Sequence, residues 1–324
     1  MTLIDPEQPL EPGTRAWILT AGVTGCEVQC LGVAGALGLE PEMKRVRPRP
    51  PGSWLAPWGP ATPTPGVEAP WPDIVFACGR QTIPYARMIR RQSRGKTFVA
   101  VLQNPKVRPS AFDFVWVPAH DRLEGPNVLS TLISPHTLTR KKLAEAAAAF
   151  APSIASLPHP RVAVLLGGTN AVYTFDEAAA ARLGGQLARL CDEEGVSLLV
   201  TPSRRTGAAQ TRIITEKLHS KPAQVWPGEG PNPYFAYLGS ADAVIVTCDS
   251  VNMIGEAAFT GKPVHVIEME GGGGKFRRFL DAVYAAGYAR PFRGALEQWS
   301  YAPPDTAGEI ARAIAKAYRF RKTT

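Results

Sequence analysis

A strand–turn–helix segment at residues 242–269 carries the residue types and spacing best suited to chemistry. It reads DAVIVTCDSVNMIGEAAFTGKPVHVIEM and predicts a buried strand, a polar turn, a helix and a second buried strand. Asp249, Ser250 and Asn252 lie at the helix start, and Glu256 lies further along the helix. Free N–H groups and the positive end of the helix dipole suit a phosphate, and a carboxylate can accept two hydrogen bonds from a ribose diol. The segment predicts a nucleotide-diphosphate pocket; the alternative is an ordinary βαβ unit in which Asp249 or Ser250 only caps the helix.

A glycine pair follows the first strand of the second half, in the stretch LLGGTNAVY. Ligands of open parallel sheets bind beyond the carboxyl ends of strands, where this stretch lies. Gly167 and Gly168 allow a backbone to approach an anion closely, and Thr169 and Asn170 can add hydrogen bonds. The stretch therefore predicts part of the same phosphate site, unless the glycines only shape a tight strand–helix turn.

Length and composition describe a globular protein of roughly two domains. The chain has 324 residues, of which 45% are hydrophobic and 20% charged. Its five cysteines are scattered and form no C-x-x-C pair, which favours a reducing, cytoplasmic compartment over a disulfide framework or a zinc site. The first residues, MTLIDPEQPLEPGTR, lack the apolar core of a signal peptide. No run approaches the ~18 apolar residues of a membrane span.

The net charge of +8 favours anionic partners. Basic residues concentrate at 44–50, 86–96, 139–142, 203–205 and 275–278. No nucleic-acid-binding motif or interleaved aromatic pattern accompanies them, so nucleic acid is not expected as a partner. A membrane surface or an anionic substrate suits these clusters better, and a basic surface that only aids solubility is the alternative.

Strand and helix patterns alternate in both halves, which predicts a parallel sheet in each. Strands are expected at 16–21, 73–77, 97–102, 112–117, 161–166, 197–201 and 223–226 and on either side of the helix in 242–269. Helices are expected at 27–37, 83–94, 140–150, 176–194, 208–219, 233–239, from 275 and at 306–320. The long stretch 48–72 is rich in Pro and Trp and predicts a loop, and the proline-bearing stretch 151–160 predicts a linker between domains.

Several familiar motifs are absent. The glycines near residues 22–38 do not match G-x-G-x-x-G, so no NAD fingerprint is present. GGGGK at 271–275 is followed by Phe276 where a P-loop needs Ser or Thr, and it predicts a flexible loop. The histidines show no i, i+4 pair for a metal, and His265 lies inside an apolar strand, which predicts a core residue. No D-x-D triplet and no G-x-S-x-G motif occurs.

Taken together, the motifs GRQTIPYARMIRR, VLQNP, FDFVWVPAHD, GPNV, GGTN, TPSRRT and VTCDSVNMIGEAAFTGKPVHV resemble the mitochondrial-fission family named for elongated mitochondria. The similarity runs from about residue 16 to the end of the chain. It implies two Rossmann-like domains facing a cleft, as in GT-B glycosyltransferases. The expected bounds are 1–150 for an acceptor-side domain, 151–160 for a linker, 161–305 for a nucleotide-binding domain, and 306–324 for a helix that packs back on the first domain.

The first loop of the chain departs from the family pattern. AGVTGCEVQCLG has Ala21 and Cys26 where the family's acidic, histidine-containing loop places Asp and His. That difference puts a role for these two positions in doubt, but Glu27 and Gln29 match.

The resemblance also implies a mechanism. Ser250 and Asn252 would hold phosphate oxygens of a uridine-type or similar nucleotide-diphosphate sugar, and Glu256 would hold the ribose. A guanidinium suits two phosphate oxygens at once, which implies a diphosphate contact for Arg204 or Arg205. Helix dipoles and basic side chains stabilise the leaving diphosphate, so no metal and no separate cofactor is expected.

An inverting transfer also needs a general base on the acceptor side. Glu27 is the first candidate, and His120 or Asp121 is the next. A carboxylate early in a helix also interacts favourably with the dipole, which is the alternative explanation of Glu27.

Three function classes stay open. The first is a glycosyltransferase with a lipid-linked or envelope acceptor. It would be cytoplasmic, with salt-sensitive attachment to the inner face of the membrane through the basic stretches 86–96 and 139–142. The second is a non-catalytic adaptor, because the plant relative is a mitochondrial-surface factor that recruits a dynamin-like GTPase. The third is another nucleotide-sugar enzyme, such as an epimerase or hydrolase.

Overall fold

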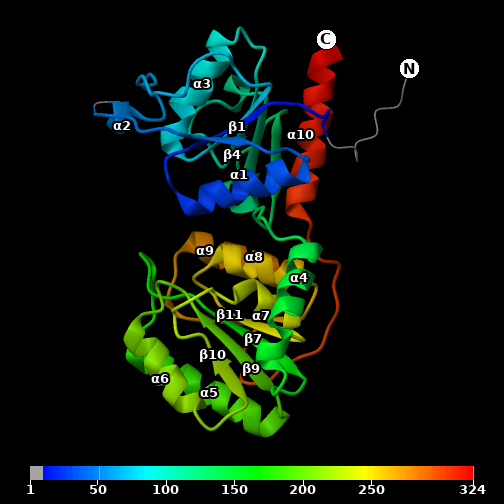
Figure 1. Cartoon of the computed structure of the whole chain (residues 1–324). Coiled ribbons are helices and arrows are strands. Elements are labelled where there is room, and N and C mark those ends of the chain that lie inside the picture. Colours follow the sequence, from blue (N-terminus) through cyan, green and yellow to red (C-terminus); the bar gives the residue numbers. More distant parts are fainter. Residues whose placement is uncertain (1–9, 51, 324) are drawn as a thin grey trace. The chain divides into compact units, whose positions relative to one another are not determined.

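A computed structural model of the chain describes residues 10–50 and 52–323. The chain forms two compact units (Figure 1). Unit 1 comprises residues up to Thr137 together with Asp305 onward, and unit 2 comprises Leu138–Pro304. Each unit is built on its own parallel six-stranded sheet.

Unit 1 has strand order β2-β1-β3-β4-β5-β6. Its strands are β1 (Ala16–Thr20), β2 (Glu42–Arg45), β3 (Ile74–Cys78), β4 (Phe98–Leu102), β5 (Phe114–Pro118) and β6 (Val128–Thr131). Its helices are α1 (Thr24–Ala36), α2 (Gly52–Leu55), α3 (Ile83–Gln92) and α10 (Thr306–Thr323), with 3-10 turns at Arg80–Thr82, Pro109–Ala111 and Ala119–Asp121.

The central strands of unit 1 are buried on both faces, which is why they read as continuous apolar runs. Alternate side chains divide into two cores. Ile18, Phe76 and Trp116 pack with α1 and α10, whereas Leu19, Val75 and Val101 pack with α3. Helix α10 therefore completes the core of unit 1 although it follows unit 2 in the sequence.

Unit 2 has strand order β10-β9-β7-β11-β12-β14. Its strands are β7 (Arg161–Leu166), β9 (Ser197–Pro202), β10 (Ala223–Val225), β11 (Ala243–Thr247), β12 (Val264–Ile267) and β14 (Arg290–Pro291). Strands β8 (Tyr173–Thr174) and β13 (Glu270–Gly271) form a separate antiparallel pair. The helices are α4 (Arg140–Phe150), α5 (Glu177–Glu194), α6 (Ala208–Leu218), α7 (Tyr234–Ser240), α8 (Val251–Phe259) and α9 (Gly274–Ala285), with a 3-10 turn at Ala151–Ile154.

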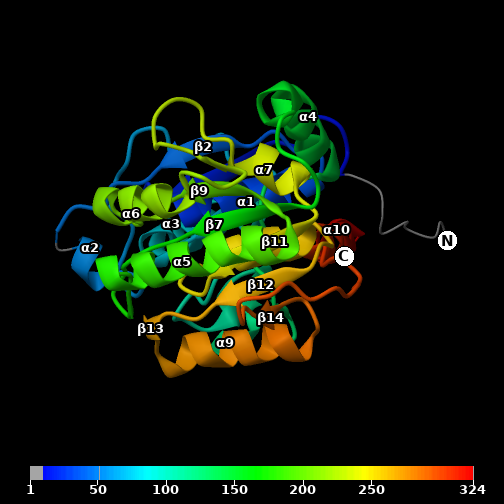
Figure 2. The same cartoon turned by 90° about the horizontal axis from the view of Figure 1, so that it is seen from below.

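Helices cover both faces of the unit 2 sheet. Helices α5 and α6 lie on one face, and α7 and α8 lie on the other (Figure 1). Figure 2 shows α5 and α6 lying side by side, and a Cβ added at Gly184 of α5 would lie 3.0 Å from Lys217 of α6. Glycine thus allows close helix packing at this point.

In each sheet, the order in which successive strands are added reverses at one position. In unit 1, the strands that follow β1 in sequence lie on opposite sides of it, so β1 and β3 flank the switch point; in unit 2 the corresponding pair is β7 and β11. Ligands of open parallel sheets bind in the crevice at the carboxyl ends of such strands. The topology therefore selects two places for a site, one in each unit.

The stretch 151–160 is not a linker between the units, and the boundary expected at residue 150 falls earlier. The chain passes between units after Thr137 and again after Pro304. Helix α4 belongs to unit 2 because it packs on α7, where the rings of Phe150 and Tyr237 lie 5.5 Å apart. The basic stretch 139–142, expected in the first domain, consequently lies in unit 2.

Three other expectations can be compared with the fold. His265 is a fully buried residue of β12 and accepts a hydrogen bond from the Glu297 N–H at 2.9 Å, as predicted. The GGGGK stretch is held more firmly than a flexible loop, because Gly271 belongs to β13 and the Gly272 N–H donates to the Val172 carbonyl at 2.6 Å. The expected loop at 48–72 contains α2.

Replacing Gly239 by alanine tests the assignment of α4 to unit 2. A Cβ at this position in α7 would lie 2.5 Å from the Leu143 carbonyl oxygen. We expect Gly239→Ala to lower the free energy of unfolding by about 1–3 kcal/mol, measured by chemical denaturation. Gly185→Ala in α5 is the control, because a Cβ added there would have no atom of another element within 4 Å. This substitution should stabilise the protein by about 0.5–1 kcal/mol. Equal effects of the two substitutions would contradict the packing.

Candidate functional site

The carboxylate of Asp249 lies at the switch point of unit 2 and joins three loops. Its side chain is 0% exposed. Oδ1 accepts a hydrogen bond from the Thr247 hydroxyl at 2.6 Å, and Oδ2 accepts one from the Gly168 N–H at 3.0 Å. The Arg205 guanidinium donates to the same Oδ2 at 2.7 Å. Because its charge is paired and both oxygens are bonded, this carboxylate can remain buried while it holds the loops after β7, β9 and β11 together.

Gly167 and Gly168 are required by the closeness of these loops. A Cβ on Gly167 would lie 2.0 Å from Asp249 Oδ1, and a Cβ on Gly168 would lie 2.0 Å from the Arg205 carbonyl oxygen. The Gly167 N–H donates to the Thr247 hydroxyl at 2.7 Å. The glycine pair therefore does shape a tight turn, and it does so by letting two other loops approach.

Thr169 and Asn170 stabilise the loop that contains them. The Thr169 hydroxyl accepts the Phe175 N–H at 3.0 Å, and Asn170 Oδ1 accepts the Tyr173 N–H at 3.0 Å. Asn170 Nδ2 also donates to the Asp249 carbonyl at 3.4 Å. Thr169 is exposed, so the loop reaches the surface at this residue.

The loop after β9 contains two arginines, of which Arg205 is paired with the Asp249 carboxylate and Arg204 is not. The Ser203 hydroxyl donates to the Gly167 carbonyl at 3.0 Å, and the Thr206 hydroxyl accepts the Ser203 N–H at 2.8 Å. Arg205 has a 43% exposed side chain although it is paired with the buried carboxylate. Arg204 is exposed and forms no recorded ion pair with the described residues. Both guanidinium groups thus retain donors for an anion.

The start of α8 matches the predicted turn, with the capping role assigned to Ser250. The Ser250 hydroxyl accepts the Met253 N–H at 3.4 Å, whereas Asp249 forms the network described above. The first N–H groups of the helix, at Val251 and Asn252, have no acceptor within the helix. Asn252 is exposed, so this end of the helix offers donors to a bound anion.

Glu256 lies in α8 and is only partly exposed. Its Oε2 accepts a hydrogen bond from the Tyr234 hydroxyl at 2.6 Å. Burial raises the pKa of Glu256 from 4.5 to about 7, and the hydrogen bond from Tyr234 partly opposes that shift. Ionisation of a carboxyl group in this environment lowers the stability of the fold. A pKa shifted in this way is typical of groups retained for binding or catalysis.

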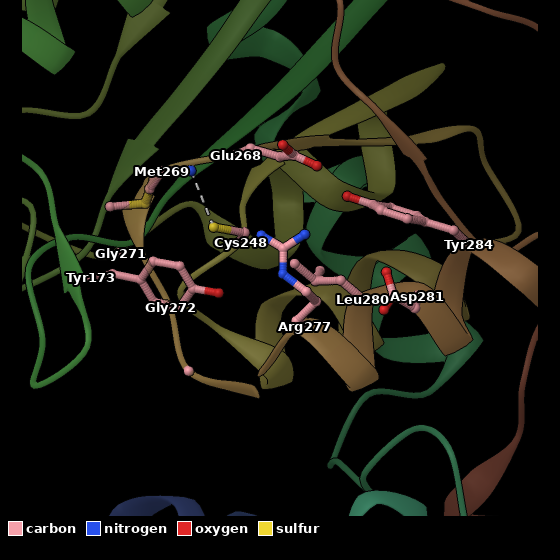
Figure 3. Close-up of a pocket in the computed structure, with 11 residues that line it drawn as sticks. Tyr173, Cys248, Glu268, Met269, Gly271, Gly272, Arg277, Leu280, Asp281 and Tyr284 are labelled. Carbon is pink, nitrogen blue, oxygen red and sulfur yellow. Dashed lines mark hydrogen bonds between the residues drawn. The ribbon is translucent and has the colours of Figure 1, made fainter. Parts of the chain in front are cut away.

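A small cavity lies beside this network, at the carboxyl ends of β11 and β12 (Figure 3). Its volume is about 60 Å³, which can hold a few water molecules or the polar edge of a ligand but not a nucleotide. Figure 3 shows the Arg277 guanidinium extending from α9 toward Cys248 and Glu268. The hydroxyl of Tyr284 is buried and forms no hydrogen bond with the described residues, and burial raises the pKa of Tyr284.

Glu27 lies at the other switch point, in the first turn of α1 after β1. Its Oε1 accepts a hydrogen bond from the buried Thr20 hydroxyl at 2.5 Å, and the same hydroxyl accepts the Gly22 N–H at 2.9 Å. Both explanations of Glu27 fit this position, because the carboxylate is near the positive end of the helix and is only partly buried.

Buried thiols and amides surround the base of this unit 1 site. The pKa of the Cys26 thiol is lowered, chiefly by a hydrogen bond with Cys78, and burial raises the pKa of Cys78. Gln29 Oε1 accepts a hydrogen bond from Gln103 Nε2 at 2.9 Å. Gln103 has φ of 91° at the end of β4, a conformation that costs on the order of 1–3 kcal/mol and often marks functional sites.

His120 and Asp121 lie in the turn after β5, with His120 Nε2 3.9 Å from Asp121 Oδ1. In the sheet, β3 and β4 separate β5 from β1, which places the strand axes about 14 Å apart. The fold thus puts Glu27 and the His120–Asp121 pair at the same edge of the sheet but not in one cluster.

The structure adds site residues that the sequence patterns do not reveal. The hydroxyls of Tyr234, Thr206 and Thr247 donate hydrogen bonds to three predicted site residues, which are Glu256, Gly167 and Asp249 respectively. Thr206 follows a predicted strand, Thr247 ends one and Tyr234 lies at the start of the predicted helix 233–239, which is the available local signal. Their partners lie far away in sequence, and no spacing rule indicates them.

Among residues 10–50 and 52–323, no group of His, Cys, Asp or Glu side chains is arranged to hold a metal ion. Within the same part of the chain, no helix is both long and apolar enough to cross a membrane.

Comparison with protein families gives one match over nearly the whole chain. The family described as "Mitochondrial fission ELM1" matches residues 24–318. The "Mitochondrial fission protein ELM1" of Arabidopsis thaliana is 33% identical over 281 residues, which cover 78% of this chain and 66% of the plant protein. The match therefore spans slightly less than two thirds of that relative. The predicted family resemblance is confirmed.

Solved structures support the fold. MurG of Acinetobacter baumannii superposes with a TM-score of 0.50 at 14% identity, over 94% of this chain and 95% of that protein. The UDP-GlcNAc 2-epimerase of Methanocaldococcus jannaschii, solved with UDP-GlcNAc and UDP, gives 0.55 at 11% identity, over 94% and 99%. These proteins have the GT-B fold, which confirms the predicted fold class of two Rossmann-like α/β domains.

Removing the Arg205 guanidinium should destabilise the protein because it leaves the Asp249 carboxylate buried without its counter-ion. We expect Arg205→Met to lower the free energy of unfolding by about 1–3 kcal/mol, a value reduced from that of a fully buried pair because Arg205 is partly exposed. The loss should shrink in the Asp249→Asn background, as a double-mutant cycle measures.

Arg204→Met is the matched control, since the exposed neighbour should change stability by less than about 0.5 kcal/mol. Additive effects of Arg205→Met and Asp249→Asn would show that the pair does not hold the loops.

Proposed function

The chain belongs to the mitochondrial fission ELM1 family, and from the geometry of unit 2 we propose that it binds a nucleotide-diphosphate sugar there and transfers the sugar without a metal ion. The observation that carries this proposal is the Asp249 network. It fixes the loop that contains Arg204 and Arg205 beside the start of α8, at the switch point of a parallel sheet. A UDP-type donor is the preferred ligand class.

The diphosphate would lie at the start of α8. The N–H groups of Val251 and Asn252, the Asn252 side chain and the backbone near Thr169 offer hydrogen bonds to phosphate oxygens. Arg204 and the remaining donors of Arg205 supply positive charge. The buried Asp249 carboxylate does not repel the phosphate strongly, because Arg205 neutralises it. Its role is to fix the loops rather than to bind phosphate itself.

Glu256 would accept the ribose hydroxyls, and the cavity beside Cys248 would accommodate a polar edge of the sugar. Oε2 of Glu256 is already held by Tyr234, which orients the carboxylate for a diol. Arg277, Glu268 and Tyr284 supply a cation, a carboxylate and a hydroxyl around the cavity. The sugar-facing part of the site is therefore polar on several sides.

Unit 1 would bind the acceptor, for which a lipid-linked or envelope molecule is the expected class. In an inverting transfer, an acceptor oxygen attacks the anomeric carbon, the bond from that carbon to phosphate oxygen breaks, and a base takes the acceptor proton. Glu27 is the proposed base because it lies at the unit 1 switch point, where its carboxylate accepts a hydrogen bond from the Thr20 hydroxyl. His120 and Asp121 are second candidates for that role. The nucleoside diphosphate leaves with its charge stabilised by the helix and the arginines.

A non-catalytic adaptor is the second candidate, and one observation favours it. Cys26, which takes the place of an expected histidine, is a buried free thiol that forms a hydrogen bond with the Cys78 thiol. The switch point of unit 1 thus has a thiol core where an acid–base group would be useful. The name of the plant relative points the same way, and an adaptor could retain a nucleotide site without transferring a sugar.

Glu256→Gln should strengthen the fold at alkaline pH and weaken nucleotide binding. The folded pKa of about 7 is above the ordinary 4.5, so the folded state holds its proton more tightly than the unfolded chain. The contribution of protonated Glu256 to the free energy of unfolding is therefore fully present below about pH 4.5 and is lost as the pH rises through about 7. We expect Glu256→Gln to raise the free energy of unfolding at pH 8 by about 1–3 kcal/mol and to reduce UDP affinity about tenfold or more in calorimetry.

Glu216→Gln, on the exposed face of α6, is the control for both measurements and should change neither. Unaltered UDP affinity in Glu256→Gln would remove Glu256 from the site.

UDP binding to the intact protein should not require a divalent cation. We expect the dissociation constant for UDP, measured by calorimetry, to be the same with EDTA and with added Mg²⁺, because side chains and the helix end neutralise the diphosphate. Arg204→Gln should weaken binding about tenfold, and Arg189→Gln, an exposed arginine of α5, should have no effect. Loss of binding in EDTA would contradict the metal-independent site. Binding without sugar transfer or UDP-sugar hydrolysis would favour the adaptor.

A further inference from the structure

The turn at residues 52–58, named the tryptophan turn below, exposes three large apolar side chains together. Trp54 is 73% exposed, Leu55 50% and Trp58 67%. Isolated exposed apolar residues are normal on protein surfaces, but three within five positions form a patch. Figure 1 shows α2, the start of this turn, at an edge of unit 1 beside α3.

The tryptophan turn is held firmly in place. Arg80 Nη2 donates to the Ser53 carbonyl at 3.0 Å, and Arg87 Nη1 donates to the Trp58 carbonyl at 3.1 Å. Ala56, between the exposed side chains, is 0% exposed. Two arginine side chains, one from the 3-10 turn Arg80–Thr82 and one from α3, thus fix the backbone of the turn while its largest side chains face water, so the exposure is a defined feature of the surface.

A cationic hollow adjoins the tryptophan turn through Arg87. This hollow, named the arginine hollow below, has a volume of about 540 Å³. Its charged lining consists of Arg87, Arg90, Arg91, Arg94, Arg321 and Asp113. Asp113 is bonded to Arg90 at 3.3 Å and Arg321 at 2.9 Å.

The arginine hollow has unpaired positive charge. Arg91 and Arg94 are exposed and form no recorded ion pair with the described residues. The hollow therefore has five arginines against one carboxylate, a surplus that attracts anions.

We propose that the tryptophan turn and the arginine hollow together form a contact surface for an anionic lipid bilayer. Tryptophan side chains favour the interface between headgroups and acyl chains, and guanidinium groups bind the phosphates of anionic headgroups. The three side chains at the turn expose on the order of 400 Å², about half of the area that one partner buries in a standard protein interface. A bilayer needs no such area, because shallow insertion and charge act together. This surface lies in unit 1 and does not depend on nucleotide binding by unit 2.

Co-sedimentation of the full chain with vesicles tests this surface. One set of vesicles contains phosphatidylcholine alone, and the other contains phosphatidylcholine with phosphatidylglycerol. We expect the wild type to bind the anionic vesicles at least about tenfold more strongly, and to release them as salt is raised. Its tryptophan emission should shift to the blue on the anionic vesicles only.

Two pairs of substitutions separate the two parts of the surface. Trp54→Ser with Trp58→Ser should weaken binding to anionic vesicles at least about tenfold and remove the emission shift. Arg91→Gln with Arg94→Gln should weaken the same binding about tenfold. The controls are Phe320→Ser, which replaces a 71% exposed aromatic residue of α10, and Arg189→Gln with Arg212→Gln, which removes two charges from unit 2. Both should bind as the wild type does, and all variants should retain the wild-type unfolding temperature and UDP affinity.

Three results would overturn the proposal. The first is a wild type that, at low salt, binds neither type of vesicle or binds both types equally well. The second is a tryptophan double variant that binds anionic vesicles as well as the wild type, because charge alone would then explain adsorption. The third is a wild-type dimer in sedimentation equilibrium that dissociates in the tryptophan variant, because a second copy would then cover the patch.

Discussion

The fully buried carboxylate of Asp249 is the constraint on which the unit 2 site depends. A charge in this position requires a counter-ion and bonded oxygens, and these come from Arg205, Thr247 and the Gly168 backbone. The carboxylate leaves no room for a side chain at position 167, and the nearby Arg205 backbone leaves none at position 168. Loops that follow three different strands are consequently fixed beside the start of α8, so that a nucleotide site would be ready before its ligand arrives and would lose little entropy on binding.

The two switch points differ in chemistry although their sheets share one topology. Unit 2 offers arginines, a free helix start and the partly buried Glu256, all of which suit a phosphorylated ligand. Unit 1 offers Glu27 above a buried core of thiols and amides, with a strained Gln103 backbone. A GT-B fold allows either transfer or simple binding. The chemistry of unit 2 thus suits nucleotide binding more closely than the chemistry of unit 1 suits catalysis.

Local sequence patterns predicted most elements of the fold, because buried parallel strands read as apolar runs. They missed β2, whose residues EMKR are largely exposed, and the half-exposed edge strand β6. They placed a linker at 151–160 because prolines mark loops anywhere, whereas the assignment of α4 depends on its packing against α7 around Gly239. Spacing alone predicts Ser250, Glu256 and the glycine pair as site residues. The bond between Gly168 and Asp249 joins positions 81 residues apart, and no local pattern indicates it.

Hydrogen–deuterium exchange of the full chain with and without UDP locates the ligand in solution and so tests whether unit 2 holds the nucleotide. A nucleotide site in unit 2 predicts slower exchange in the loops at 167–170 and 203–207 and in the first turns of α8 at 250–256, with no change in α5. Unchanged exchange in all three segments at saturating UDP, or protection confined to unit 1, would contradict the assignment of the nucleotide site to unit 2.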